Sequence, residues 1–402
     1  MIGTLNTSDK RVTIIGAGIS GLLIGYILKK KGYQVTIHEK SNRVGGLIQT
    51  KHISHGMVET AAHSILVNEE IQKFMDELGV ELLSINPDSK ARYIYRNGKM
   101  RRMPLTIFEI FSTLFHFFSK PKLTKPLDQL TLEEWGNAYL GKAATQYLLG
   151  PFTAGIFACL PSNLNAKLSF PKLIPSSGKI SLFQHLRSLR KKPKTKRAQM
   201  MVFKNGTEDL ILKLHQALKS EIQLNSNIHE HQSIEGNLIL STPSPEIEYS
   251  PLVTATVFIS KNAFTKKEPK GVGVLIPRGE NIRMLGCLFN SSAFSGRVNQ
   301  EQETSLTVMY GGTSDPTALQ IQDADLKTLI DQELRQLLGT NAAPAHIEIT
   351  KWPKAIPIYS SKLTEYIQHL SQTFSSKPGK MVFTNFSGQV SIRGMIETTL
   401  IQ

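Results

Sequence analysis

Arg11-Val-Thr-Ile-Ile-Gly-Ala-Gly-Ile-Ser-Gly21 decides the fold of this 402-residue chain, because a short β-branched strand runs directly into the glycine pattern G-x-G-x-x-G. Helix-forming residues follow to Lys31, and a second strand over residues 33–38 ends at the acidic Glu39. This order is typical of a dinucleotide site, in which the diphosphate lies at the amino end of the helix and the carboxylate accepts from ribose hydroxyls. We expect that site to include Gly16, Ala17, Gly18, Ile19, Ser20, Gly21 and Glu39.

The residues after Glu39 favour a flavin over a nicotinamide cofactor. Arg43-Val-Gly-Gly46 follows almost at once, and its paired glycines leave room for backbone beside a bulky planar group. This R-x-G-G extension resembles the flavin amine oxidase superfamily, in which the segment runs past FAD. A plain turn is the alternative interpretation.

Composition and charge narrow the class of protein. The 40% hydrophobic and 20% charged residues are those of an ordinary folded protein, and the length allows about two to three domains. With only Cys159 and Cys287, a disulfide framework and a Cys-rich metal site are excluded, so we expect a cytoplasmic chain without a metal. The amino terminus lacks a signal peptide, and no apolar run reaches the roughly 20 residues that a membrane-spanning helix needs.

The net charge of +15, from 47 Lys and Arg against 32 Asp and Glu, favours an anionic partner. Residues 135–207 contain no acidic residue, and their densest basic run is Arg187 to Arg197. A solvated loop and an electrostatic contact with anionic lipid at the inner face of the cell membrane are equally open interpretations of that run. Nucleic acid is not expected, because no binding module accompanies the charge. A homodimer stays open.

Leu105 to Lys120 predicts an amphipathic helix. Its apolar face is formed by Ile107, Ile110, Phe111, Leu114, Phe115 and Phe118. We expect this face to pack on the protein's own domain rather than lie in a membrane interface, because the polar face is poor in Lys and Arg. Arg101, Arg102, Lys120 and Lys122 at the helix ends keep the membrane interpretation open.

Further along the chain, Asn97-Gly98 predicts a hairpin turn, and helices are expected at residues 210–219 and 324–338. Strands are expected at residues 80–83, 236–241, 252–260, 273–277, 284–289, 304–310 and 345–350. Strands alternate with helices at both ends of the chain, which predicts a parallel sheet built from discontinuous pieces.

Four ordered sequence blocks resemble the protoporphyrinogen/coproporphyrinogen oxidases over nearly the whole chain. They are Gly150-Pro-Phe-Thr-Ala-Gly155 with Ser169-Phe-Pro-Lys-Leu173, then Gly271 to Pro277, Trp352 to Tyr359, and Asn385 to Ile392. The resemblance implies an FAD enzyme that removes six electrons from a porphyrinogen, with hydride passing to the flavin and oxygen as acceptor. Protoporphyrinogen IX is the expected substrate, within heme biosynthesis. Coproporphyrinogen III, another flavin amine oxidase or desaturase substrate, and a non-catalytic tetrapyrrole or lipid carrier are the alternatives.

The resemblance also implies a fold and a domain order. The fold is α/β, with a Rossmann-like FAD-binding domain, a mixed α+β substrate domain and a helical insertion. We expect residues 1–90, 201–250 and 351–402 to form the FAD-binding domain, residues 91–200 the basic helical insertion, and residues 251–350 the substrate-binding domain.

Site residues carry over from the family by position. Arg92 matches the arginine that pairs with a substrate propionate, a task that suits a guanidinium fork. The apolar clamp on the macrocycle corresponds to Gly155, Val272, Leu275 and Met309. For the flavin, the family pattern adds Lys40, Arg43, Gly46, Leu47, Ala61, Ile228, Asn385, Val390, Ser391 and Ile392. No side chain is assigned as a catalytic base.

Several positions depart from the family pattern. Val272 stands where many relatives have an aromatic ring, and Ala61 and Gln389 stand where relatives usually have glycine. The stretch between Ile228 and Ser241 is shorter than the family's, and the chain ends soon after Glu397, where relatives continue a helix. A trimmed flavin domain and a protein that has lost turnover are both consistent with these departures.

Overall fold

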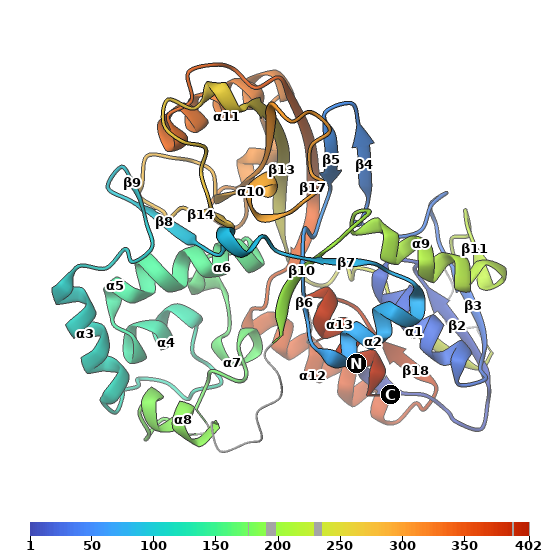
Figure 1. Ribbon diagram of the computed structural model, residues 1–402. Coiled ribbons are helices and arrows are strands. Elements are labelled where there is room, and N and C mark those ends of the chain that lie inside the picture. Colours follow the sequence, from blue (N-terminus) through green and yellow to red (C-terminus); the bar gives the residue numbers. More distant parts are fainter. Residues whose placement is uncertain (176, 190–197, 229–234, 388–389, 402) are drawn as a thin grey trace.

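The computed structural model describes residues 1–175, 177–189, 198–228, 235–387 and 390–401. The two largest β-sheets lie one above the other in the view of Figure 1, with a group of helices beside them. Most of the predicted basic run (190–197) and Gln389 lie outside the described residues.

A six-stranded sheet carries the dinucleotide motif. Its order is β1 (Ile2–Thr4), β18 (Lys380–Val382), β12 (Asn237–Leu240), β2 (Arg11–Ile15), β3 (Gln34–His38) and β11 (Ile222–Gln223). All neighbouring strands pair in parallel except β1 with β18. The prediction of a parallel sheet assembled from distant pieces is therefore confirmed.

Helices join this sheet in a common apolar core. They are α1 (Ile19–Lys30), α2 (Glu69–Leu78), α9 (Glu208–Ala217) and α13 (Ile392–Leu400). Ile14 and Ile37 from the strands are completely buried against Leu22 and Ile24 of α1. The β-branched strands and the Leu/Ile-rich helix thus bury each other, which is what the first 40 residues predict.

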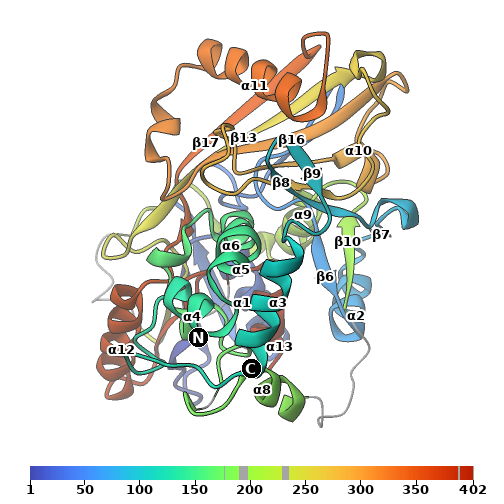
Figure 2. The same cartoon turned by 90° about the vertical axis from the view of Figure 1, so that its left-hand side faces the viewer.

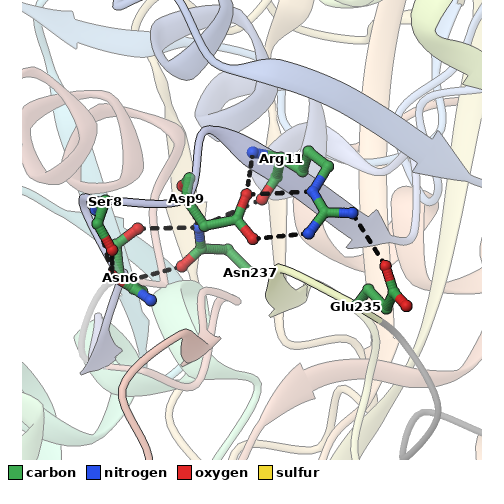
Figure 3. A network of polar contacts seen from close by, with 6 residues as sticks. All are labelled: Asn6, Ser8, Asp9, Arg11, Glu235 and Asn237. Carbon is green, nitrogen blue, oxygen red and sulfur yellow. Dashed lines mark hydrogen bonds and ion pairs between the residues drawn. The ribbon is translucent and has the colours of Figure 1, made fainter.

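Asn237 fixes β12 beside β2 (Figure 3). Its buried amide nitrogen donates to the backbone oxygens of Asn6, Asp9 and Arg11, and its amide oxygen accepts from the Asn6 N–H at 2.6 Å. Arg11 also pairs with Asp9 and Glu235 at 3.0 Å each. One buried side chain therefore bonds four backbone groups of the segment from Asn6 to Arg11.

The second sheet has seven strands. Its order is β17 (His346–Pro357), β13 (Tyr249–Ser260), β16 (Glu303–Gly311), β15 (Gly286–Leu288), β14 (Gly273–Leu275), β8 (Arg92–Arg96) and β9 (Lys99–Arg101). Only β8 and β14 pair in parallel. Helix α11 (Asp323–Leu338) packs on one face, where Leu326 and Ile330 meet Val253, Val308 and Tyr310. The opposite face is free of that helix.

The predicted hairpin turn is confirmed, since β8 and β9 pair antiparallel around Asn97 and Gly98, with φ of 52° and 73°. The strand expected at residues 345–350 extends to Pro357 as β17. The smaller strands are the hairpin β4 (Thr50–Ile53) with β5 (Gly56–Glu59), and the set β6 (Ile65–Val67), β10 (Gln199–Phe203) and β7 (Leu82–Ser84).

A third core holds the helical part of the chain. Its helices are α3 (Ile107–Phe118), α4 (Leu132–Tyr139), α5 (Lys142–Ala144), a π-helical turn (Thr145–Leu149), α6 (Gly150–Phe157), α7 (Ala166–Ser169), α8 (Leu182–Leu189) and, from further along the chain, α12 (Ser361–Ser375). Short pieces are α10 (Asn290–Ala293) and 3-10 turns at Pro87–Ser89, Pro161–Asn163, Lys219–Glu221, Lys261–Ala263 and Pro316–Gln320. Within the described residues, no helix has the length and apolarity needed to cross a membrane.

Helix α3 corrects the sequence interpretation. The side chains expected to pack inward, among them Ile107, Phe111 and Phe115, are instead 67–70% exposed, and no residue of α3 is buried. The helix is held mainly by its other side, where Glu109 pairs with Arg96 at 2.7 Å. The expectation that this apolar face packs on its own domain is therefore wrong.

Candidate functional site

The turn between β2 and α1 has the geometry of a phosphate cradle. Gly16 has φ of +101°, and its N–H donates to the His38 carbonyl at 2.7 Å. A Cβ on Gly21 would lie 1.9 Å from the Gly16 oxygen, so only glycine allows the helix to approach the turn. A Cβ on Gly18, in contrast, would meet no atom within 4 Å. The space over Gly18 can therefore receive a ligand.

The amino end of α1 faces that space without a side-chain cap. Gly18 is the N-cap residue, and no described side chain bonds to the first turn there. Ser20 is buried, and its hydroxyl contacts the Met395 sulfur of α13. Ile19 lies beside it in the first turn and is partly buried. Free N–H groups at a helix start bind anions, so this end suits a diphosphate.

Glu39 occupies the position expected of the ribose-binding carboxylate. It follows β3, and its Oε2 accepts from the N–H of the fully buried Ala17 at 2.8 Å. Its Oε1 accepts from the N–H and the hydroxyl of Ser41. The next residue, Lys40, is exposed. The carboxylate is thus held still at the edge of the glycine cradle.

The R-x-G-G segment lies directly against the cradle. Gly18 and Gly45 form a β-bridge, and a Cβ on Gly46 would have the Gly18 Cα as its neighbour at 3.5 Å. The Arg43 guanidinium donates to the backbone oxygens of Val44, Ile48 and Gly46. Arg43 therefore shapes this loop rather than reaching outward.

Thr60 connects this loop to the seven-stranded sheet. Its hydroxyl donates to the Leu47 carbonyl at 2.8 Å, and its own carbonyl accepts from the indole N–H of Trp352 at 2.8 Å. Ala61, the neighbouring predicted flavin contact, is partly buried against the core of the six-stranded sheet. Leu47 and Ala61 are therefore brought together where the two sheets meet.

A buried ion pair that the sequence did not predict lies beside Ala61. Arg297 and Glu59 are 4% and 2% exposed in their side chains, and Nη1 of Arg297 lies 3.3 Å from Oε1 of Glu59. The Nε of Arg297 has no partner among the described atoms. Burial raises the pKa of Glu59, although Arg297 and the Thr207 N–H oppose that shift. Burial and Arg297 together lower the pKa of His63 to about 3. The Arg297 side chain thus has an unused donor near the predicted flavin segment.

The remaining predicted flavin contacts lie in two segments, one that follows β11 and one around the start of α13. The Ser226 N–H donates to the Glu39 carbonyl, which places the segment that leads to Ile228 beside the ribose position. Helix α13 begins at Ile392, and the Ser391 hydroxyl caps it by accepting from the Gly394 N–H. Val390 packs partly buried against the helical core, and the Asn385 carbonyl accepts from the Tyr359 hydroxyl.

The α11-free face of the seven-stranded sheet gathers three of the five predicted substrate residues. Register pairs Leu275 with Gly286, and Gly286 with Met309, so Leu275 and Met309 share one face. Val274 and Val308, their neighbours in sequence, lie in the core under α11 on the other face. Arg92 pairs with Gly273, two residues before Leu275, and so belongs to the same face.

Gly155 and Val272 occupy different places relative to this face. A Cβ on Gly155 would lie 3.0 Å from a methyl group of Leu275, so α6 covers the sheet at this point (Figure 1). Val272 is 8% exposed and directly precedes β14. The exposed Arg92 makes no ion pair with a described residue. Trp352 lies on the same face of the sheet, because it pairs with Leu252. The hydrogen bond from its indole joins this face to Thr60.

Contacts of Arg96 hold the β8–β9 hairpin, which also carries Arg92. Arg96 pairs with Glu109 of α3, and its guanidinium lies 3.6 Å from the ring centroid of Tyr147 in the π-helical turn. The Arg96 interaction lowers the pKa of Glu109 to about 2. Sequence spacing gave no signal for this contact. It fixes β8 against the helices that cover the sheet face.

Comparison with known proteins agrees with this geometry. Residues 19–237 and 242–383 match the model of the family described as flavin containing amine oxidoreductase, so the chain belongs to that family. The resemblance inferred from the sequence blocks is therefore confirmed at the family level, and the protein is a flavin-containing oxidoreductase of α/β fold.

Individual relatives cover nearly the whole chain. Protoporphyrinogen oxidase 2 of Arabidopsis thaliana is 27% identical, with 96% of this chain and 91% of the relative aligned. Coproporphyrinogen III oxidase of Bacillus subtilis is 22% identical over 96% and 95%. Among solved structures, a putative protoporphyrinogen oxidase from Exiguobacterium superposes with a TM-score of 0.77 at 18% identity over 99% of this chain and 100% of the other. Reduced UDP-galactopyranose mutase does so with a TM-score of 0.70 at 13% identity over 97% and 94%.

Proposed function

We propose that this chain is an FAD-dependent porphyrinogen oxidase that converts protoporphyrinogen IX to protoporphyrin IX in heme biosynthesis, with oxygen as acceptor. One observation carries the proposal: an exposed arginine, Arg92, shares a sheet face with Leu275 and Met309, and that face reaches the segment that carries Ala61. A cation beside an apolar surface suits a flat tetrapyrrole that bears carboxylates. The names of relatives that align over nearly the whole chain support the same substrate class.

The glycine cradle fits FAD. The open space over Gly18 and the uncapped start of α1 would hold the diphosphate, and Glu39 would accept from the ribose. Leu47, Ala61 and the start of α13 at Ile392 would hold the flavin part of the cofactor. When bound, FAD accepts hydride from a substrate carbon and passes the electrons to oxygen.

The chain's own residues would bind and orient the substrate. Arg92 would hold a propionate through paired N–H groups, and Leu275 and Met309 would contact the macrocycle. Gly155 would let α6 lie close to Leu275, because a side chain there would meet Leu275. Orientation of the reacting carbon, rather than proton transfer by a named base, is the contribution that these residues make.

Coproporphyrinogen III is the second candidate substrate, since the Bacillus subtilis relative that bears its name aligns over 96% of this chain. It carries propionates where protoporphyrinogen IX carries vinyl groups, so it would require further cations near the site. A carrier without turnover would bind either tetrapyrrole and leave it unoxidised.

Steady-state turnover tests the proposal. FAD-loaded protein is mixed in air with each porphyrinogen, and porphyrin fluorescence is followed against the spontaneous rate without protein. We expect faster fluorescence growth with protoporphyrinogen IX than with coproporphyrinogen III. The opposite preference would favour coproporphyrinogen III as the substrate. Binding without oxidation, by a folded protein that holds flavin, would establish the carrier.

A further inference from the structure

Arg96, at the end of β8, joins three elements of the fold. Its Nη1 and Nη2 donate to the two carboxylate oxygens of Glu109 on α3, at 2.7 and 2.9 Å. Nη1 also donates to the Pro104 carbonyl at 2.6 Å, and the guanidinium lies 3.6 Å from the ring centroid of Tyr147 in the π-helical turn. A planar fork with a carboxylate at its edge and a ring on its face is fixed in position and orientation. We call Arg96, Glu109 and Tyr147 the Arg96 junction.

The Tyr147 side of the Arg96 junction leads into α6. The π-helical turn ends at Leu149, and α6 begins at Gly150 with no residue between them. Helix α6 covers the α11-free face of the seven-stranded sheet, where a Cβ on Gly155 would lie 3.0 Å from a methyl group of Leu275. A π-helical turn is rare and occurs often at functional sites. The junction therefore reaches the helix that lies over the candidate substrate face.

The β8 side of the Arg96 junction leads to Arg92. Arg92 and Arg96 are four positions apart in one strand, so their side chains belong to the same face of the sheet. The ladder between β8 and β14 covers Arg92 to Ile94 and ends before Arg96. On its other side β8 pairs with β9, which is the edge of the sheet. The junction therefore holds the end of β8 that the ladder with β14 does not reach.

Arg92 and α6 take their relative position from this one junction. Arg96 belongs to the strand that carries Arg92, and its guanidinium contacts the turn that leads to α6. Figure 2 shows β8 and β9 above α3 in that view, with α5 and α6 beside it. Paired N–H groups bind a carboxylate in a narrow range of geometries. A small shift of β8 relative to α6 would therefore weaken that bond more than it weakens apolar contact with the macrocycle.

We propose that Arg96 is a positioning residue of the candidate substrate site: through Glu109 and Tyr147 it holds Arg92 at the distance from α6 at which a tetrapyrrole carboxylate is bound. Arg96 acts through Arg92 and determines the preference for the carboxylate over its ester. The inference rests on the proposed function, because it concerns the same site. Its tests measure binding and local stability without turnover.

Equilibrium binding is the first test. FAD-loaded protein is titrated with protoporphyrin IX and with its dimethyl ester, and the change in porphyrin fluorescence gives two dissociation constants. Their ratio, ester over acid, measures the contribution of the carboxylates and should be about 10 or more for wild-type protein. Arg96→Met removes the fork and should lower this ratio by about fivefold or more. Wild-type protein that binds both ligands equally, or neither, would refute the proposed function and this inference with it.

Arg283→Met is the matched control. Arg283 also forms a bidentate pair, with Asp315 at 2.6 and 2.9 Å, but its backbone N–H donates to Glu333 of α11, on the other side of the sheet. The control should keep the wild-type ratio, and urea unfolding shows that both variants are folded. A wild-type ratio in Arg96→Met would overturn the proposal. So would an equal loss of affinity for acid and ester, which is the result expected of a purely stabilising contact.

Further variants separate the Arg96 junction from a general loss of charge. Glu109→Gln keeps the cap of α3, because glutamine also serves at that position of a capping box, and should lower the ratio. Tyr147→Phe keeps the ring beside the guanidinium and should resemble wild type, whereas Tyr147→Leu should lower the ratio. Arg92→Ala combined with Arg96→Met should give the ratio of Arg92→Ala alone. Additive losses, or equal ratios for the Phe and Leu variants, would contradict the proposal.

Hydrogen exchange provides a readout without a tetrapyrrole. In Arg96→Met the amides of β8 and α6 should exchange about tenfold faster or more than in wild-type protein, because the junction no longer opposes local opening. The amides of β17, at the other edge of the same sheet, should be unchanged, and Arg283→Met should leave those of β8 unchanged. Exchange in β8 and α6 that does not respond to Arg96→Met would show that the junction does not hold them and would overturn the proposal.

Discussion

Replacing Arg92 by Ala should raise KM for a carboxylate-bearing porphyrinogen and leave kcat nearly unchanged. The side chain is exposed, and only its backbone lies in a ladder, opposite Gly273, so the folded state should lose less than about 0.5 kcal/mol. A hydrogen bond to a charged group contributes about 1.5–3 kcal/mol, and each 1.4 kcal/mol is tenfold. The expected increase in KM is therefore about 10- to 100-fold.

The assay is steady-state porphyrin fluorescence with two substrates, the free acid and its propionate methyl ester. Arg92→Ala should weaken the acid and leave the ester almost unaffected, and Arg92→Lys should be intermediate because an ammonium lacks the paired N–H geometry. Arg335→Ala is the matched control, since α11 lies on the other face of the sheet and Arg335 pairs, among the described residues, with Asp331. An unchanged KM for the acid, or equal losses for acid and ester, would refute the role of Arg92.

Three further changes have defined outcomes. Gly18→Ala should fold, because its Cβ meets no atom within 4 Å, but bind FAD at least about tenfold more weakly by fluorescence titration, with Gly150→Ala as control; equal affinities would refute the cradle. Asn237→Ala leaves backbone groups unpaired and should cost about 2–4 kcal/mol in urea unfolding, and a loss no larger than that of the exposed Asn205→Ala would contradict this. Burial lowers the pKa of His63 to about 3, so from pH 6.5 down to about 3 only the unfolded chain holds that proton. The free energy of unfolding should therefore decrease as the pH is lowered through this range, by less than about 1.4 kcal/mol per pH unit. The His63→Gln variant should show a weaker dependence on pH, and equal slopes for variant and wild type would contradict this reasoning.

Local sequence patterns predict the elements whose structure depends on residues that are close together in the chain. The strand, glycine turn and helix at residues 11–30 lie next to one another in the chain, and so do Glu39 and the Asn97-Gly98 turn. The sequence also identifies α3, but not which side of it faces the protein. That choice depends on Arg96, whose contact with Glu109 has no periodic signature.

The candidate site depends on register, which local pattern does not contain. Leu275 and Met309 share a face only because β14, β15 and β16 align through Gly286. Arg297 and Glu59 are 238 residues apart and carry no motif, so their buried pair emerges only from the fold.

Anaerobic mixing of FAD-loaded protein with protoporphyrinogen IX tests the central claim most directly. The account predicts that the visible absorbance of the flavin bleaches as the substrate is oxidised, and that admission of oxygen restores it while porphyrin fluorescence appears. Flavin that remains oxidised in the presence of bound protoporphyrinogen IX and coproporphyrinogen III, in protein shown to be folded, would contradict the account.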